Sequence, residues 1–228
     1  MPKSFDSFSK NYNKVVNDAI RQTGYDAESL VSAKLQKIAN LYPDLADNKF
    51  HLLDFGCGVG NLYGSVAHFF PKAIYTGVDT SKDSIKKACS RFQDKAAFQE
   101  YDSQEWKSCK YDLIVSAGVF HHIPHVEHSK VVEKLFSFLN PNGKLVVWEH
   151  NPLNPITQKI IRDCPIDEDA VLVSSKNIRV LFEKVSLSNI QISYTTFFPK
   201  FLSALNFMDQ FLGWLPLGGQ YLVTGQKN

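Results

Sequence analysis

Three glycines at alternate positions, Gly56, Gly58 and Gly60, follow a short apolar run, and Asp54 comes two residues before the first of them. Glycine lets the backbone turn sharply out of a strand and leaves no Cβ in the way of a ligand. Dinucleotide-binding enzymes use G-x-G-x-x-G to place a pyrophosphate on a helix N-terminus, whereas here the third glycine comes one position early. A carboxylate at Asp54 would repel a pyrophosphate but could help to hold an ammonium group. The run therefore predicts a nucleotide-binding turn whose charge does not favour a pyrophosphate.

A strand before this turn and a helix after it are needed to position the glycines. The apolar residues at 50–55 predict the strand. The spacing of Leu62 and Val66 predicts a helix over 61–70, with Asn61 as its N-cap. Strand, glycine turn and helix together form a nucleotide-binding corner.

A second strand, over residues 74–79, ends in Asp79 and is followed by Thr80. A carboxylate in that place can accept two hydrogen bonds from ribose hydroxyls, as in adenine-dinucleotide enzymes. The alternative is that Asp79 caps the helix that begins near Ser81. We favour ribose binding because of the position of Asp79 relative to the glycine turn.

The order of these and later motifs resembles that of the class I S-adenosylmethionine (SAM)-dependent methyltransferases. The glycine run is similar to their motif I, which passes under the amino-acid end of the cofactor. Asp102 stands where the family's acid accepts a hydrogen bond from the adenine amino group, and residues 111–124, YDLIVSAGVFHHIP, look like motif II and its exit loop. The turn at 139–143 is similar to the one before the family's fifth strand.

The resemblance implies SAM as the cofactor and methyl transfer as the activity. It also implies which residues bind the cofactor. They are Tyr12, Asp54, Gly56, Cys57, Gly58, Gly60, Asp79, Thr80, Asp102, Ser103, Ser116 and Ala117.

Histidines near motif II and the fifth strand are candidates for catalysis. His121, His122 and His150 could each act as a general base, since an unperturbed imidazole takes up a proton near neutral pH. His121 and His125 have the i, i+4 spacing of a helical metal pair, but Pro124 interrupts the helix and the sequence shows no acid or cysteine that completes a ligand set. We therefore expect no metal.

The segment after the fifth strand resembles a bacterial methyltransferase subgroup with the signature E-H-N-P-x-N-P-x-T, here residues 149–157. Its two Asn-Pro pairs predict a shaped loop rather than a helix. Because ligands bind at the carboxyl ends of strands, we expect His150 and Asn151 to face a ligand. The alternative is that Asn151 and Asn154 stabilise local turns.

Two further segments could determine the acceptor. Residues 5–12 resemble the F-D-x-x-A-x-x-Y opening of small-molecule methyltransferases, in which Tyr12 would close over the cofactor; the alternative is a helix that packs Phe5, Phe8 and Tyr12 on the core. Residues 197–219 are rich in large apolar side chains. They predict a lid, a dimer surface or a transient membrane or lipid contact, or else a helix buried against its own sheet.

Composition sets limits on these interpretations. The chain has 228 residues, 44% of them hydrophobic and 21% charged, with a net charge of +2. It has no basic stripe that would indicate nucleic acid as a partner. The absence of an apolar leader and of paired cysteines favours a cytoplasmic location.

Helix and strand patterns alternate from residue 50 onward, which predicts an α/β fold: a Rossmann-like, mostly parallel seven-stranded sheet with helices on both faces and a C-terminal antiparallel hairpin. Helices are expected over residues 5–20, 28–41, 61–70, 82–93, 127–138 and 175–184. We expect a single domain, 1–228, made of a helical cap (1–45), a cofactor-binding core (50–150) and substrate-side loops with the final strands (151–228).

The sequence thus predicts a SAM-dependent methyltransferase that acts on a small acceptor of apolar or lipid-like character. Two alternatives stay open, a non-enzymatic protein that binds SAM or S-adenosylhomocysteine (SAH) and an NAD-dependent dehydrogenase. The acceptor, the methylated atom and the oligomeric state are not predicted.

Overall fold

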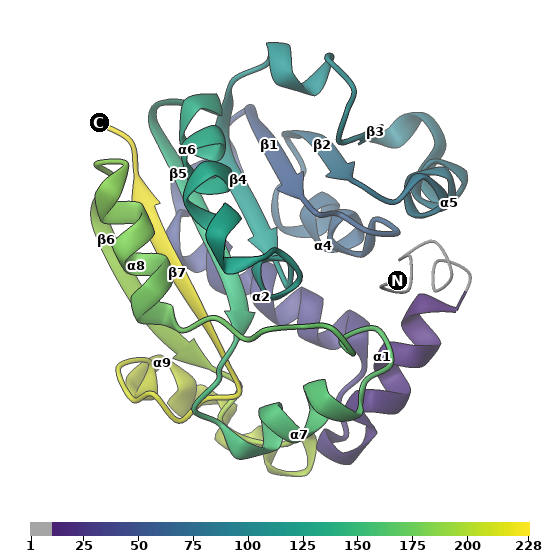
Figure 1. Cartoon of the computed structure of the whole chain (residues 1–228), viewed down its shortest axis with the longest axis vertical. Coiled ribbons are helices and arrows are strands. Elements are labelled where there is room, and N and C mark those ends of the chain that lie inside the picture. Colours follow the sequence, from purple (N-terminus) through teal and green to yellow (C-terminus); the bar gives the residue numbers. More distant parts are fainter. Residues whose placement is uncertain (1–10) are drawn as a thin grey trace.

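Seven strands form one sheet in the order β3-β2-β1-β4-β5-β7-β6 (Figure 1). The structure is a computed structural model, and it describes residues 11–228. Neighbouring strands from β3 to β5 are parallel, and β7 runs antiparallel to both β5 and β6. This confirms the predicted mostly parallel sheet with a C-terminal antiparallel hairpin. The strands are β1 Phe50–Phe55, β2 Ala73–Asp79, β3 Ala97–Glu100, β4 Tyr111–Ala117, β5 Leu139–His150, β6 Ser188–Thr195 and β7 Gln220–Gln226.

Helices cover both faces of the sheet because its strands are apolar on both sides. Leu53 of β1 and Ile114 of β4 belong to the core beneath α6 and α8, whereas their neighbours Leu52 and Leu113 belong to the core beneath α2, α4 and α5. Successive side chains of a strand point to opposite faces, so a continuous apolar run fills two cores. The helices are α1 Tyr12–Ile20, α2 Ala27–Leu41, α3 Pro43–Asp47, α4 Asn61–Phe69, α5 Lys82–Phe92, α6 His128–Phe138, α7 Pro155–Asp163, α8 Ser175–Lys184 and α9 Asp209–Leu212.

The helices predicted from residue 28 onward agree with the structure to within one or two residues at each end. Of the helix predicted over 5–20, the described part is α1, and residues 5–10, with Phe5 and Phe8, lie outside the described residues. Asn61 is not the N-cap of α4 as predicted, because Gly60 holds that place in a left-handed conformation. Asn61 is the first helical residue, and its Oδ1 accepts a hydrogen bond from Arg91.

The expectation that the Asn-Pro pairs exclude a helix is wrong for the second pair. Pro155 begins α7, and the Asn154 side chain caps it by accepting a hydrogen bond from the Thr157 N–H at 3.0 Å. Proline is favoured at the first helical position because its missing N–H has no partner there in any helix. Figure 1 shows α7 and α1 across the end of the sheet at which the parallel strands terminate.

The segment 197–219 is not a helix buried against the sheet. It contains a 3-10 helix, η7 Lys200–Met208, followed by α9, and several of its large side chains face outward. Phe201, Phe211 and Trp214 are 81%, 67% and 75% exposed. The membrane or lipid contact expected of this segment stays a prediction, as does the cytoplasmic location. Within residues 11–228, no helix has the length and apolarity that crossing a membrane requires.

Candidate functional site

The glycine turn leaves β1 through three left-handed residues, as its sequence predicts. Gly56, Gly58 and Gly60 have φ angles of 79°, 53° and 78°, a region that other residues enter only at a cost. Gly56 also lies against Val119: a Cβ at residue 56 would be 2.4 Å from a methyl group of that side chain. The turn therefore needs glycine at residue 56 for its backbone angle and for its close packing.

Asp79 fixes this turn to the end of β2. Its carboxylate accepts a hydrogen bond from the Gly58 N–H and another from the Ser81 N–H, both at 2.8 Å. The cap of α5 is the Ser81 side chain, which accepts a hydrogen bond from the Ser84 N–H. Asp79 thus shapes the loop, its role in ribose binding stays a prediction, and Thr80 beside it is exposed.

Asp54 is a buried acid under the glycine turn. The Tyr75 hydroxyl donates a hydrogen bond to its Oδ2 at 2.5 Å. Burial raises the pKa of the Asp54 carboxyl to about 7, the Tyr75 hydrogen bond opposes this increase, and the charge of Asp79 adds to it. Near neutral pH this carboxyl therefore titrates, and a cation placed beside it would favour the ionised form.

The raised pKa of Asp54 predicts a pH-dependent stability difference between wild type and Asp54→Asn. The folded state favours the protonated form of this carboxyl. Its contribution to the free energy of unfolding is therefore complete below the unfolded pKa near 3.9, and it is lost as the pH rises through about 7. Relative to wild type, Asp54→Asn should gain up to about 4 kcal/mol of unfolding free energy from pH 4 to pH 8. Urea unfolding across that range measures the difference, and a difference that does not vary with pH would contradict the prediction.

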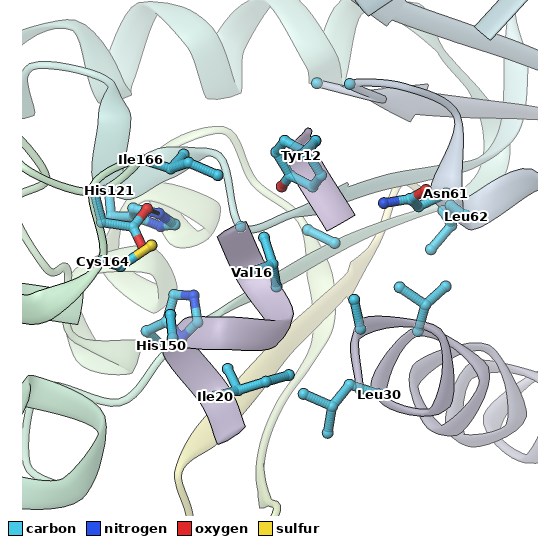
Figure 2. A pocket seen from close by; sticks show the side chains of 18 of the residues that line it. Tyr12, Val16, Ile20, Leu30, Asn61, Leu62, His121, His150, Cys164 and Ile166 are labelled. Atoms are coloured by element: carbon cyan, nitrogen blue, oxygen red, sulfur yellow. Dashed lines mark ion pairs between the residues drawn. The ribbon is translucent and has the colours of Figure 1, made fainter. Parts of the chain in front are cut away.

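A cavity lies between the glycine turn and helices α1, α2 and α7 (Figure 2). Apolar side chains such as Val16, Ile20 and Leu30 form one wall, and Tyr12 lies above them. Burial, together with the charges of Asp167 and Asp79, raises the pKa of the Tyr12 hydroxyl, so this group stays neutral. Of the predicted site residues, those that line the cavity are Tyr12, Asp54, Gly56, Cys57, Gly58, Ala117, His121, His122 and His150.

The other predicted cofactor residues lie outside this lining. Asp102 is exposed after β3, and the Ser103 hydroxyl lies within hydrogen-bonding distance of side-chain oxygens of Gln99 and Glu105, at 3.2 and 3.0 Å. Ser116 is wholly buried in β4, where its Oγ meets no hydrogen-bonding partner among the described residues. Gly60 ends the glycine turn, Asp79 and Thr80 stand at the end of β2, and none of the three is part of the lining. The roles that the sequence assigns to these residues stay predictions.

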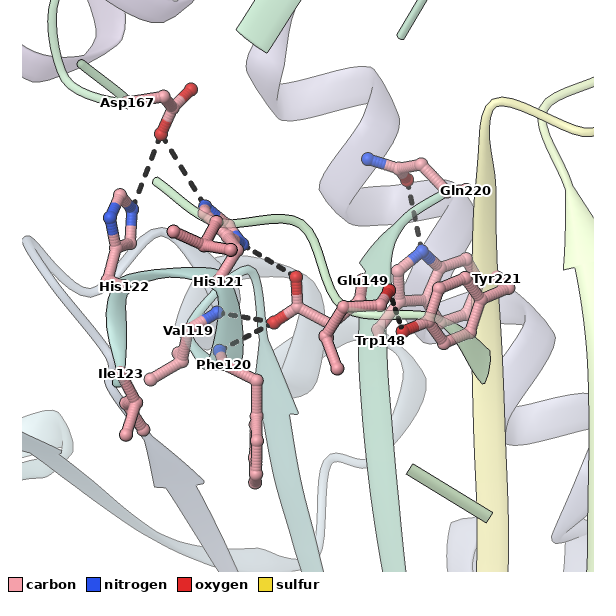
Figure 3. Close-up of polar contacts among 12 residues, drawn as sticks. Val119, Phe120, His121, His122, Ile123, Trp148, Glu149, Asp167, Gln220 and Tyr221 are labelled. Carbon is pink, nitrogen blue, oxygen red and sulfur yellow. Dashed lines mark hydrogen bonds and ion pairs between the residues drawn. The ribbon is translucent and has the colours of Figure 1, made fainter. Parts of the chain in front are cut away.

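His121 forms a buried pair with Glu149 of β5 (Figure 3). Its Nδ1 lies 2.6 Å from the Glu149 carboxylate, and both side chains are almost completely excluded from solvent. The other carboxylate oxygen accepts hydrogen bonds from the Val119 and Phe120 N–H groups at 2.8 and 2.7 Å. Burial alone would lower the pKa of His121, but Glu149 and Asp167 raise it to about 10. The charge of His121 outweighs the effect of burial and lowers the pKa of Glu149 to about 2. Through its contacts with His121 and the two N–H groups, Glu149 holds the motif II loop on β5.

Asp167 reaches the same cluster from the loop after α7. One of its oxygens lies 3.5 Å from Nε2 of His121 and 3.3 Å from Nε2 of His122. The loop is tied to the cluster by the Val171 N–H, which donates a hydrogen bond to the His121 carbonyl at 2.8 Å. Burial would raise the pKa of Asp167, but the two histidines lower it far below its usual value. A sequence scan could not find this acid, because 45 positions separate it from His122.

His150 and Lys34 complete the polar part of the cavity. Burial and the neighbouring His121 charge lower the pKa of His150 to about 4, so its imidazole is neutral at physiological pH. Burial lowers the pKa of the Lys34 amine to about 8, against the opposing effect of Glu149. Sequence reasoning missed Lys34, which lies on the buried side of α2 near the Trp148 ring.

Asn151, which we expected to face a ligand, is a structural residue. Its amide donates hydrogen bonds to the Pro216 and Gly218 carbonyls at 3.1 and 2.7 Å, and its carbonyl accepts one from the Leu153 N–H. The two amide bonds join the end of β5 to the segment just before β7, and the third closes a local turn. The alternative interpretation, turn stabilisation, is therefore correct for Asn151.

Comparison with known proteins agrees with this geometry. Residues 53–145 match a family model described as "Methyltransferase domain". A SAM-dependent methyltransferase from Archaeoglobus fulgidus has a similar structure, with a TM-score of 0.68 at 18% identity over 95% of this chain and 100% of that chain. The fold is that of SAM-dependent methyltransferases. The plantazolicin methyltransferase BpumL, solved with SAH, gives a TM-score of 0.68 at 16% identity over 97% of this chain and 92% of that chain.

Among curated proteins, a trans-aconitate 2-methyltransferase from Methylobacterium radiotolerans is 32% identical over 111 residues, which are 48% of this chain and 42% of that protein. The chain spans less than half the length of the trans-aconitate 2-methyltransferases that it matches. Together these comparisons show a methyltransferase domain over residues 53–145 and the fold of SAM-dependent methyltransferases over nearly the whole chain.

Proposed function

We propose that this protein transfers a methyl group from SAM to a small acceptor of apolar or lipid-like character. The observation that carries the proposal is one continuous cavity. It begins at the left-handed glycine turn above Asp54 and ends between apolar faces of α1, α2 and α7. A cofactor on the turn and an acceptor between the helices would then share one enclosed space.

Bound SAM supplies an activated methyl group. The protein therefore has to bind and orient the two reactants and to exclude water. Orientation alone can lower a barrier by about 7–11 kcal/mol. The residues that fit the cofactor are the glycine turn, whose backbone leaves room for a ligand, and Asp54, which can accept a hydrogen bond from an ammonium group. Tyr12 of α1 and Leu62 of α4 would close the cavity around it.

The acceptor end of the cavity has an apolar wall, and Lys34, Asp167 and the histidines place groups of both charges around it. Val16, Ile20 and Ile161 supply the apolar wall, and Lys34 supplies a cation. An acceptor with an apolar body and an acidic group fits this lining. The histidines proposed for catalysis line the same cavity. His121 is held between the carboxylates of Glu149 and Asp167, so we assign it a positioning role. His122 and His150 stay the candidates for a general base. Membership of the E-H-N-P-x-N-P-x-T subgroup also stays a prediction.

Thermal unfolding with SAH, with NADH and without ligand tests the cofactor. SAH at 100 times its dissociation constant adds about 2.7 kcal/mol, which is about 5–11 °C for a chain of this length. Asp79→Ala removes the acceptor that holds the Gly58 N–H and should reduce the shift, whereas Glu133→Ala on the exposed side of α6 should keep it.

Each outcome separates the candidate functions. A shift with SAH, followed by SAH formation when acceptors are supplied with SAM, supports the enzyme. A shift with SAH but no transfer to any apolar or acidic acceptor favours the non-enzymatic binding protein. A shift with NADH alone would overturn the proposal in favour of a dehydrogenase.

A further inference from the structure

Two histidines and an aspartate converge in the lining of the cavity. The Nε2 atoms of His121 and His122 both face one oxygen of Asp167, and the three ligand atoms lie within 4.8 Å of one another (Figure 3). These side chains come from the short 3-10 helix Phe120–His122 and from the loop after α7. Their side-chain exposures are 2%, 18% and 13%, so the cluster is enclosed rather than part of a solvated surface.

The distances in this cluster are not those of direct hydrogen bonds. Charge-assisted N–H···O bonds are about 2.7–2.9 Å long, and the His121–Glu149 contact, at 2.6 Å, is of that kind. The contacts to Asp167 are 3.5 and 3.3 Å. Ligands about 2.0–2.1 Å from a tetrahedral ion lie about 3.3–3.4 Å from one another. Both contacts to Asp167 therefore match the separation of two ligands that share one ion, and the two histidine nitrogens lie within 4.8 Å of each other.

Glu149 adds a second and independent feature of a metal site. A histidine that binds a metal through one nitrogen usually donates its other N–H to a carboxylate or carbonyl, which fixes the ring and its tautomer. Glu149 accepts at Nδ1 of His121 and leaves Nε2 directed at Asp167. Glu149 is itself fixed by the Val119 and Phe120 N–H groups. The ring of His121 is thus oriented before any ion arrives.

We propose that His121, His122 and Asp167 bind one divalent transition-metal ion, and that zinc suits this donor set best. Imidazole and carboxylate ligands favour zinc among the abundant ions of this class. Three protein ligands are typical of sites that keep a position open for a ligand from solution. All three side chains line the cavity, so the open position faces the space proposed for the acceptor. An oxygen of the acceptor is the chemical group that this position would take.

Zinc binding to the full-length protein tests the site directly. After treatment with a chelator, the protein is titrated with zinc in competition with a chromophoric chelator, and bound metal is counted by elemental analysis. Wild type should hold about one zinc ion per chain, and His122→Ala and Asp167→Ala should lose at least about 100-fold in affinity. His125→Ala is the matched control, because His125 is a neighbouring histidine outside the cluster.

Cobalt gives a readout that depends on geometry rather than on activity. Co²⁺ bound by wild type should show the intense visible absorption of a tetrahedral site, and His122→Ala should abolish it. Should Asp167→Ala fail to fold, His122→Ala carries the test, since this partly exposed side chain makes no buried ion pair as short as that of His121.

The proposal is overturned if wild type binds less than a tenth of an equivalent of zinc, or if His122→Ala and Asp167→Ala bind it like wild type. Equal loss in His125→Ala would also overturn it, because the binding would then not depend on this cluster. SAH titration of the metal-free protein keeps the two proposals apart, since the glycine turn shares no residue with the three ligands.

Discussion

Glu149→Ala should destabilise the metal-free protein by about 3–5 kcal/mol, more than any other single carboxylate substitution that we consider. The substitution removes one member of a buried ion pair and leaves the His121 imidazolium without its closest counter-charge. It also leaves the Val119 and Phe120 N–H groups without their acceptor, and the Phe120 N–H is buried. Urea unfolding measures the loss.

Glu183→Ala is the matched control for this prediction. Glu183 also pairs with a basic side chain, Arg179 at 2.8 Å, but both side chains are about half exposed. Surface pairs of this kind contribute little, so we expect a change within about 0.5 kcal/mol. Glu149→Gln should fall between the two, because its carbonyl can still accept the two backbone hydrogen bonds. A loss below about 1 kcal/mol in Glu149→Ala would show that the pair does not hold the motif II loop.

The sequence predicts the sheet well because each strand carries its own signal. Leu52 and Leu53 face opposite cores, so the run that contains them is apolar throughout. Asp79 and the glycines stand at strand ends, where the chain must leave the sheet. Local pattern and tertiary position agree at these places, and the mostly parallel order follows from the alternation of strands and helices.

The polar cluster could not be predicted in the same way because its members are distant in the chain. His121 and His122 are adjacent, but Glu149 and Asp167 come from β5 and from the loop after α7. Whether an acid completes a histidine pair depends on where these segments meet, and no periodicity contains that information. The one signal available was Glu149 itself, a charge that directly follows the buried strand residues 145–148.

The course of residues 152–163 shows how a local rule can be applied too broadly. Both Asn-Pro pairs were expected to exclude a helix, and the first does lie in a turn. At the second pair, the same two residue types form the N-cap and the first residue of a helix. The Asn154 side chain accepts a hydrogen bond from the Thr157 N–H, and Pro155 has no N–H that would need an acceptor. The difference arises because the residues after Pro155 place Ile160 and Ile161 toward the cavity, which the pair alone does not indicate.

Gly56→Ala has the other large expected effect. An alanine at a φ of 79° costs about 1–2 kcal/mol, and its Cβ would lie 2.4 and 3.0 Å from the two methyl groups of Val119. Relieving such overpacking costs about 1–3 kcal/mol more. If the turn keeps its shape, the sum of about 2–5 kcal/mol is lost from stability. If the turn relaxes instead, the loss falls on SAH binding, where about 3 kcal/mol corresponds to a 100-fold weaker affinity.

Unfolding and SAH titration together measure both parts of this free energy. Gly58→Ala separates the backbone cost from the clash, because its φ of 53° is also left-handed but a Cβ there would meet nothing within 4 Å. Val119→Ala removes the clashing methyl groups, so Gly56→Ala combined with it should show a favourable coupling of about 1–3 kcal/mol in a double-mutant cycle. Without such coupling, contact with Val119 would not be the reason that residue 56 must be glycine, and only the left-handed backbone would remain to explain it.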